Sequence, residues 1–369
     1  MTRREFAIVL LAATIIYAFA VRWPAPDIGT FLGPWVDQIR RTGFSVPVGN
    51  YSPPYLYLLA LTSALPTFVA VKLLAIGGAG WLAFCVSRLA REIGADALAA
   101  AAFTIVLPTV ILNAAVFGQC DTIWVGCCVL AVTEALKTRT YRMALWAGVA
   151  FAFKAQAAFL APFCIVCLTS RRAWAAAIPF LVYAIAIAPA AIAGWPLHDL
   201  LTIYFRQARI DYIGDAPNLW AIPGWLGVRG SDIYSLGYAL GAAAALAIVF
   251  RKRRDVLALA ILSAIALPFF LPKMLERSFF LADILSLAGA LRDRRGVVLA
   301  ALVQTGSAVS ILGELTKFDW LNPLASVSMV FALLLAVRPA TKGGTDAGSA
   351  LAGDEVPQDG SVPTAALSS

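Results

Sequence analysis

The sequence predicts an all-α, polytopic transmembrane protein, and three observations indicate this class. Of its 369 residues, 61% are hydrophobic and 14% charged, which leaves too little polar surface for a water-soluble protein of this length. Apolar runs recur from Glu5 to Val337. Short loops that are basic or contain proline and glycine separate them. We expect residues 1–337 to form one membrane domain of about 11 to 13 helices, because each crossing needs about 20 apolar residues. Residues 338–369, rich in Gly, Asp, Ser, Pro and Thr, are expected to form a disordered cytoplasmic tail.

Lysine and arginine number 29 against 21 acidic residues, a formal net charge of +8. They occur in clusters between the apolar runs, from Arg3 and Arg4 at the start to Arg338 and Lys342 near the end. This distribution is typical of cytoplasmic loops, so it indicates membrane topology and argues against nucleic-acid binding. We expect both termini in the cytoplasm and, because no organellar signal is found, a bacterial cell (inner) membrane.

Five loops are predicted on the extracytoplasmic side when every basic cluster is placed in the cytoplasm. They contain the polar residues that interrupt the apolar pattern. The loops are 21–53, 118–122, 195–218, 271–278 and 313–320. We therefore look for the active site on that side.

The first of these loops holds an acidic residue and an amphipathic segment. Asp27 follows the first span, and in segment 31–41 apolar residues such as Phe31 and Trp35 recur at helical spacing among polar neighbours. We expect an amphipathic helix that lies in the membrane interface and ends near Gly43. An inert interfacial linker is the alternative, although a carboxylate at membrane depth argues against it.

Two stretches do not fit simple spans. Segment 143–168 has basic signals at both ends, yet it allows only about 20 Å per leg at 1.5 Å per residue. We expect it to dip into the membrane or to use short helices, with Lys154 and Gln156 at the apex. Segment 53–87 is too long for one span and short for two.

Polar residues in the outer loops are candidates for chemistry. Asp121 is either a site carboxylate or the N-cap of a helix that begins at Thr122. Gln119 either binds sugar hydroxyls or ends a helix. Lys273 and Arg277 are four residues apart and would share a helical face, as a phosphate clamp or as a snorkelling interfacial pair.

Other candidates lie nearby or in apolar surroundings. Glu276 either orients one of these cations or binds a metal. Lys154 interrupts an apolar stretch, which makes it a functional-site candidate facing a donor phosphate. Trp35 and Trp220 either stack on sugar rings or anchor the protein at the interface, and Asn218 is a candidate reader of hydroxyl groups.

Five motif segments follow one another between Asp27 and Phe280. They are Asp27-x-x-x-Phe31-Leu32-x-Pro34-Trp35 with Asn50-Tyr51-x-Pro53-Pro54-Tyr55, Phe117-Gly118-Gln119-Cys120-Asp121, Lys154-Ala155-Gln156, Ala216-Pro217-Asn218-Leu219-Trp220, and Pro272-Lys273-Met274-Leu275-Glu276-Arg277-Ser278-Phe279-Phe280. In order and approximate spacing they resemble motifs of the GT-C glycosyltransferases, especially bacterial relatives of the GPI-anchor mannosyltransferases. Where that family commonly reads His-Glu-Arg-Tyr, this chain has Leu275 and Ser278 in the outer two positions.

The resemblance implies a GT-C-like membrane fold and sugar transfer with inversion. It implies that Asp27 is the base for the acceptor hydroxyl, and it points to substrate binding by the polar and aromatic residues of the motifs. These are Trp35, Asn50, Tyr51, Gln119, Asp121, Lys154, Gln156, Asn218, Trp220, Lys273, Glu276 and Arg277.

The expected donor is a sugar carried on polyprenyl phosphate, because nucleotide sugars are not available outside the cytoplasmic membrane. A hexose is expected, mannose first, and the acceptor would be a glycan, lipid or protein. No cofactor is assigned, and participation of a divalent metal is left open. A lipid-linked-sugar flippase or secondary transporter is the main alternative, although the charges gather on one face and no inverted halves are found. A non-catalytic membrane subunit is the third.

Overall fold

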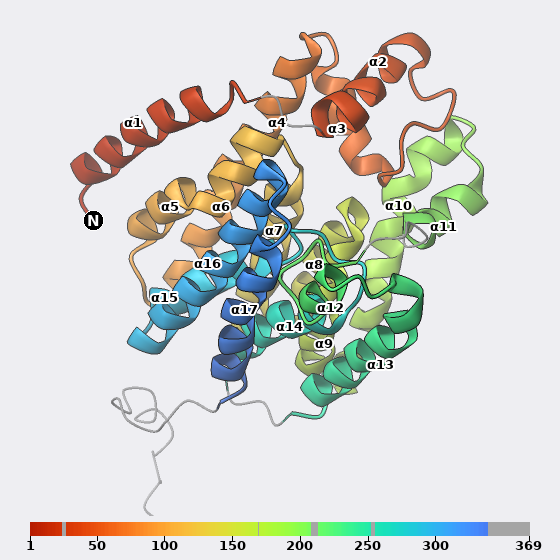
Figure 1. Ribbon diagram of the computed structural model, residues 1–369. Helices are drawn as coiled ribbons and strands as arrows, with labels where there is room; N and C mark the ends of the chain where they lie inside the picture. The colour runs from red at the N-terminus through yellow and green to blue at the C-terminus, as the bar shows by residue number, and fades with distance from the viewer. Residues whose placement is uncertain (24–26, 169, 208–212, 252–254, 339–369) are drawn as a thin grey trace, which may run out of the picture. The chain divides into compact units, whose positions relative to one another are not determined.

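The computed structural model describes residues 1–23, 27–168, 170–207, 213–251 and 255–338 (Figure 1). All regular elements of these ranges are helical, which confirms the all-α class. The α-helices are α1 Arg3–Ala20, α2 Gly33–Thr42, α3 Pro53–Thr62, α4 Thr67–Glu92, α5 Ala97–Val106, α6 Pro108–Ile111, α7 Asp121–Leu136, α8 Thr140–Phe153, α9 Ala161–Cys167, α10 Ile178–Ile192, α11 Leu197–Gln207, α12 Ala221–Trp225, α13 Gly230–Val249, α14 Val256–Phe270, α15 Phe280–Ala290, α16 Arg294–Thr316 and α17 Leu321–Val337. The π-helical turns are η1 Ile28–Leu32 and η2 Leu112–Phe117, and the 3-10 segments are η3 Ala155–Leu160 and η4 Ser170–Ala177.

Four segments are long and apolar enough to cross a membrane by themselves: Thr67–Glu92, Arg172–Ile192, Gly230–Val249 and Arg294–Thr316. A fifth is formed if Ala97–Val106 and Pro108–Phe117, bent by 56°, count as one broken span. Other apolar helices are shorter. The 15 residues of α14, for example, rise about 23 Å at 1.5 Å per residue. Of the predicted crossings, length and composition therefore support four or five among the described helices.

Breaks in the helices explain this difference. Leu107 is extended (φ −61°, ψ 127°) before Pro108, because proline disfavours the helical conformation in the preceding residue. Lys154 is extended (φ −156°, ψ 137°) between α8 and η3, so segment 143–168 consists of short helices that break at this lysine. Segment 53–87 contains one short helix, α3, and most of one long helix, α4.

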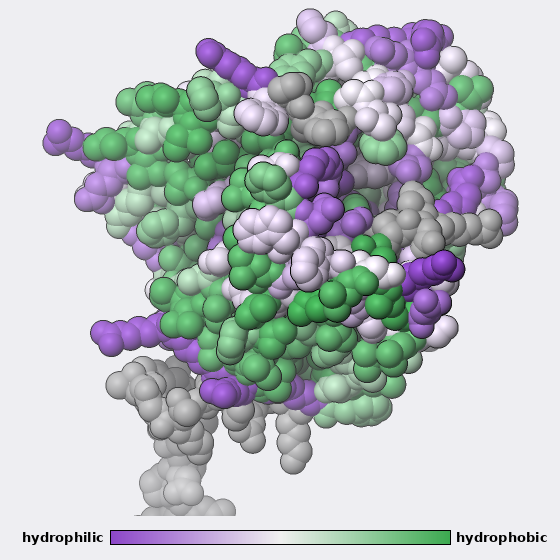
Figure 2. All heavy atoms as spheres, viewed as in Figure 1, coloured by the Kyte–Doolittle hydropathy of each residue, from purple (hydrophilic) through white to green (hydrophobic). Residues whose placement is uncertain are grey.

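Exposed apolar side chains cover much of the helical surface, as Figure 2 shows for one face. They include Phe19, Phe180, Ile192, Leu246 and Phe250. Apolar patches of this extent are unusual on water-soluble proteins, and they are the surface that lipid solvates. The structure thus supports a multi-pass membrane protein.

Two apolar clusters form the interior. The larger one is centred on α7, in which 14 of 16 residues are buried, and it includes side chains of α4, α8, α14 and α15. The second cluster joins the first-loop helices to α10, and its members include Leu32, Val36, Tyr55, Cys120 and Ile187. A helix that is buried all round, such as α7, holds its ends in fixed positions. The polar site lies at its N-terminal end, where Asp121 is the first residue.

The amphipathic helix predicted in the first loop is confirmed as α2. Trp35 and Ile39 are buried and Asp37 is exposed, and the helix ends at Gly43, whose φ of 58° favours glycine. Phe31 departs from the predicted apolar face, since it is 47% exposed. It lies in the wider π-helical turn η1, which shifts the side-chain register ahead of α2. The position of α2 in the membrane interface stays a prediction.

The chain divides into two compact units, residues 1–337 and residues 338–369. Of the second, only Arg338 lies among the described residues. The predicted disordered tail falls outside them.

Candidate functional site

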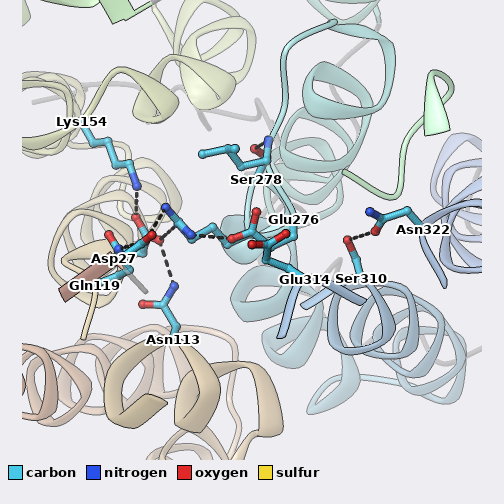
Figure 3. A network of polar contacts seen from close by, with 12 residues as sticks. Asp27, Asn113, Gln119, Lys154, Glu276, Ser278, Ser310, Glu314 and Asn322 are labelled. Carbon is cyan, nitrogen blue, oxygen red and sulfur yellow. Dashed lines mark hydrogen bonds and ion pairs between the residues drawn. The ribbon is translucent and has the colours of Figure 1, made fainter. Parts of the chain in front are cut away.

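Four charged residues from separate parts of the chain meet in one polar network (Figure 3). Asp27 precedes η1 in the first loop, and Asp121 is the first residue of α7. Lys154 lies at the break after α8, and Arg277 lies in the turns between α14 and α15. Three of the loops predicted to share one side of the membrane therefore converge.

Arg277 is the centre of the network. Its Nη2 lies 3.2 Å from Oδ2 of Asp27, its Nε 3.7 Å from Oδ2 of Asp121, and its Nη1 2.5 Å from Oε1 of Glu276. The guanidinium carbon also lies 5.6 Å from the centre of the Phe117 ring. A planar group with five N–H donors can serve three carboxylates at once, which the single ammonium of a lysine does less well.

Asp121 is buried and fully engaged. Its Oδ1 accepts hydrogen bonds from Nζ of Lys154 (2.5 Å) and Nε1 of Trp124 (2.8 Å), and its Oδ2 accepts one from Nδ2 of Asn113 (2.9 Å). The N-cap position of α7 belongs to Cys120, so the alternative that Asp121 caps a helix starting one residue later is wrong. Its side chain instead joins α7 to two neighbouring segments.

The backbone before Asp121 is shaped for this position. The wide turn η2 ends at Gly118, which adopts a left-handed conformation (φ 69°). A Cβ atom there would lie 3.0 Å from the Val71 side chain, so glycine suits both the angle and the space. The chain reverses at this glycine and presents Gln119 and Asp121 to the site.

Asp27 is the more open carboxylate. Its side chain is 20% exposed, against 1% for Asp121. Besides Arg277, its Oδ2 contacts Nε2 of Gln119 at 2.5 Å, and Oε1 of Gln119 accepts a hydrogen bond from the Tyr51 hydroxyl at 3.2 Å. Both contacts with described residues use Oδ2, which leaves Oδ1 available to a ligand.

Lys154 is buried next to Asp121, to whose carboxylate it donates a hydrogen bond. Its Nζ also lies 5.6 Å from the centre of the Tyr51 ring, and such a cation above an aromatic face is stabilised electrostatically. Gln156, two residues on, is half-buried in η3. The extended backbone at Lys154 directs its ammonium toward Asp121, at the N-terminal end of α7.

Glu276 binds Arg277, as one of its two predicted roles required. It is 4% exposed, and burial raises its pKa while the adjacent guanidinium opposes that shift. Three carboxylates and two cations leave the network one net negative charge when all five are ionised. Glu314 lies beside Glu276 in Figure 3. The pKa of Asp215 is raised to about 6, mainly by burial and then by the negative charges of Glu276 and Glu314.

The two positions that depart from the family pattern hold the turn that carries these charges. The Ser278 hydroxyl oxygen accepts a hydrogen bond from the Leu275 N–H at 2.9 Å. Ser278 is buried. This bond encloses Glu276 and Arg277 and fixes where their side chains point.

The predicted helical pair of Lys273 and Arg277 is wrong. Residues 271–279 form bends and turns after Pro272, and Lys273 has a φ of 60°. Its Nζ lies 4.1 Å from the centre of the Tyr234 ring on α13. Because the segment is not helical, a spacing of four residues does not bring the two cations to one face.

Asn218 and Trp220 use their polar groups within the protein. Nδ2 of Asn218 donates to the carbonyl oxygens of Pro268 (3.2 Å) and Leu271 (3.1 Å), and its Oδ1 accepts from the N–H of Trp220. Nε1 of Trp220 donates to the carbonyl of Phe270 at 2.8 Å. These bonds fasten the loop to the end of α14, from which the chain leads to Arg277.

Trp35 and Asn50 also support the first loop. Trp35 is buried, its ring centre is 5.0 Å from that of Tyr51, and a Cβ on Gly49 would come within 2.4 Å of its indole. Asn50 is exposed, and its carbonyl accepts a hydrogen bond from the Gln207 side chain. Trp35 therefore positions Tyr51, with no free face for a sugar ring.

Lys72 and Asn113 support the site and were not predicted from the sequence. Lys72 is buried in α4, and its Nζ donates to the carbonyls of Ala115 (2.5 Å), Val116 (2.6 Å) and Trp23 (3.2 Å). It satisfies the last carbonyls of η2, just before the site. A lysine inside a spanning run is the sequence signal by which Lys72 could have been found. Asn113 has no comparable signal, because its role depends on the π-helical turn.

In the ranges that the structure describes, no three His, Cys, Asp or Glu side chains are arranged to hold a metal ion. The carboxylates of Asp27, Asp121 and Glu276 each face a cationic side chain instead.

Comparison with protein families identifies a match over residues 50–275 to the model of glycosyltransferase family 87. The matched range includes Gln119, Asp121 and Lys154, and it lies between Asp27 and Arg277. No curated protein sequence matches the chain. Since the family match covers more than half of the chain, the protein belongs to glycosyltransferase family 87, a family of GT-C-type membrane glycosyltransferases.

Proposed function

We propose that this member of glycosyltransferase family 87 moves a hexose from a polyprenyl-phosphate donor to an acceptor on the extracytoplasmic face of a bacterial inner membrane. Mannose is the first candidate for the hexose. The observation that carries the proposal is the partly open carboxylate of Asp27 beside Arg277, with Lys154 in the same network. The acceptor oxygen bonds to the anomeric carbon as the bond from that carbon to the phosphate oxygen breaks. The configuration inverts.

The base in this reaction is Asp27. A general base needs an accessible oxygen within hydrogen-bond reach of the acceptor hydroxyl. Asp27 has such an oxygen in Oδ1, whereas Asp121 is buried and engaged by Lys154, Trp124 and Asn113. Asp27 takes the hydroxyl proton, and Asp121 positions the two cations.

The leaving phosphate is stabilised by Arg277 and Lys154. The Nε of Arg277 is buried and makes no hydrogen bond with the described residues; Oδ2 of Asp121, its ion-pair partner, lies 3.7 Å away, so this N–H has no acceptor within hydrogen-bond distance. A phosphate oxygen would supply one, through a charge-assisted bond that strengthens as negative charge develops on the leaving group. The polyprenyl phosphate departs with the bonding electron pair.

The test is transfer by the purified full-length protein in liposomes. Polyprenyl-phosphate mannose, glucose and arabinose are supplied in turn with candidate glycan, lipid and peptide acceptors, and mass spectrometry identifies any glycosylated product. We expect product with a hexose donor, mannose foremost. Movement of intact donor between leaflets without product would contradict the proposal and favour a flippase.

A further inference from the structure

The break in the chain at Lys154 takes two backbone carbonyls away from their helical partners. Lys154 is extended between α8 and η3, with φ −156° and ψ 137°. In a continuous α-helix, the carbonyls of Phe151 and Ala152 would accept hydrogen bonds from N–H groups four residues further on. Those N–H groups follow the extended residue and no longer lie above α8. Ala152 is 2% exposed, so its carbonyl needs a partner from the protein.

The hydroxyl of Tyr204 supplies the missing donor. Its oxygen lies 2.6 Å from the carbonyl oxygen of Phe151 and 3.3 Å from that of Ala152. Tyr204 belongs to α11, which lies in the third of the predicted outer loops. A hydroxyl carries one proton, and the two carbonyls share it at the end of α8. A helix from a distant part of the chain therefore caps the segment that leads to Lys154.

Ring packing fixes where this hydroxyl points. The ring centre of Tyr204 lies 5.1 Å from that of Phe151 and 5.9 Å from that of Tyr183 on α10. The rings of Phe151 and Tyr183 are 5.7 Å apart. Aromatic rings at these separations attract each other. Because the hydroxyl takes no part in this packing, Tyr204→Phe would remove the hydrogen bond and keep the ring in place.

Tyr183 provides a matched comparison within the same aromatic cluster. Its hydroxyl also donates to a backbone carbonyl, that of Leu200, at 2.7 Å. Leu200 lies inside α11, where its carbonyl also faces a helical N–H four residues on. Loss of the Tyr183 hydroxyl therefore leaves no carbonyl without a partner. Of the two tyrosines, Tyr204 is the one that binds at the break.

We infer that Tyr204 is a positioning residue, which holds the last carbonyls of α8 and so fixes the backbone from which Lys154 reaches Asp121. Phe151 and Ala152 precede Lys154 by three and two residues, so a shift of their carbonyls moves Nζ relative to the carboxylate. Tyr204 acts through Lys154 and not on the substrate. The inference rests on the proposed function in one respect, since that function assigns Lys154 to the donor phosphate.

The first test is hydrogen–deuterium exchange of the full-length protein in liposomes, which reports local opening of the backbone. In Tyr204→Phe we expect the amides of residues 154–160 to exchange about tenfold faster than in the wild type, the effect of one lost hydrogen bond. In Tyr183→Phe the same amides should exchange at the wild-type rate. Equal exchange of this segment in the two variants would overturn the inference.

The second test is binding of a polyprenyl phosphate, measured by thermophoresis on the same proteins. We expect Kd to rise about tenfold in Tyr204→Phe, because a displaced ammonium loses one charge-assisted hydrogen bond to the phosphate. Tyr183→Phe should bind like the wild type. In a protein that carries Asp121→Asn and Lys154→Met, adding Tyr204→Phe should change Kd by no more than about twofold, since the residue through which it acts is gone. A tenfold effect in that background would show that Tyr204 does not act through Lys154, and the inference would fail.

Neither test depends on turnover. If exchange and binding follow these expectations while the wild type transfers no sugar, the proposed reaction fails and the role of Tyr204 stands. If the wild type does not bind polyprenyl phosphate, the proposed donor is contradicted, and the exchange comparison decides whether Tyr204 holds the break. Active transfer with equal exchange in the two tyrosine variants would have the opposite meaning, since the reaction would stand and the positioning role would fail.

Discussion

Asp27 and Asp121 face the same guanidinium from two different regions of the molecule. Asp27 belongs to the first loop, is 20% exposed and has two partners among the described residues. Asp121 begins a helix that is buried all round, is 1% exposed and has four partners. Sharing a cation therefore does not give two carboxylates the same role. In the proposed reaction the open one accepts the proton of the acceptor hydroxyl, and the enclosed one holds other groups in place.

Removing the charge at Asp27 should have the largest effect on activity. We expect Asp27→Asn to lower kcat by about 1,000-fold, within the range typical of a lost general base. The donor KM should change little, because Arg277 and Lys154 remain. Initial rates at several donor concentrations check this, and an unchanged melting temperature in detergent serves as the folding control.

The same substitution at Asp121 should act mainly on stability. Asp121→Asn leaves Lys154 buried without its carboxylate, and breaking one side of a buried ion pair costs about 3 kcal/mol. Thermal unfolding measures the loss. Asp121→Asn combined with Lys154→Met should regain part of it, since no unpaired charge is left. If the double variant loses more stability than the two single variants lose together, this account of the pair is contradicted.

Replacing the shared cation by another cation should give an intermediate loss. We expect Arg277→Lys to lower kcat/KM by about 100-fold, because a lysine keeps the charge but not the forked contacts to Asp27, Asp121 and Glu276. Lys273→Arg is the matched control, since its cation lies over Tyr234 instead. Equal losses in the two variants would show that the network is not specific to Arg277.

The smallest expected effect lies outside the contrast between the two aspartates. The pKa of Asp215 is raised from 3.8 to about 6 by burial and by Glu276 and Glu314. The folded state therefore binds a proton more readily than the unfolded one, and stability falls as pH rises from 3.8 to about 6. Asp215→Asn should raise stability by about 1 kcal/mol at pH 7, after allowance for its partial exposure. The gain should vanish below about pH 4, where Asp215 is protonated in both states. Unfolding series at both pH values test it, with exposed Asp232→Asn as the control without gain.

Several residues of the candidate site could be singled out from the sequence, because they interrupt strong apolar patterns. Lys154 and Arg277 stood out as charges in or beside spanning runs, and Asp27 stood out in the amphipathic loop. The structure brings all three into one network. The helical breaks at Pro108 and Lys154 reduce the number of helices that are long enough to span alone.

What could not be predicted depends on tertiary contacts. The spacing of Lys273 and Arg277 indicated one helical face, but a proline and a positive φ replace the helix with turns. From the sequence, Trp220 and Asn218 are compatible both with sugar binding and with a structural role. Only the packing shows that their N–H groups donate to backbone carbonyls at the end of α14. Asn113 reaches Asp121 through a π-helical turn that has no distinct sequence pattern.

The most direct test of the account is a single-turnover measurement with the Asp27→Asn protein. The purified variant is loaded with radiolabelled polyprenyl-phosphate mannose, mixed with acceptor, and sampled for both bound donor and glycosylated product. The account predicts that donor stays bound intact while product formation falls by about 1,000-fold relative to the wild type. Product at the wild-type rate would contradict the assignment of Asp27 as the base.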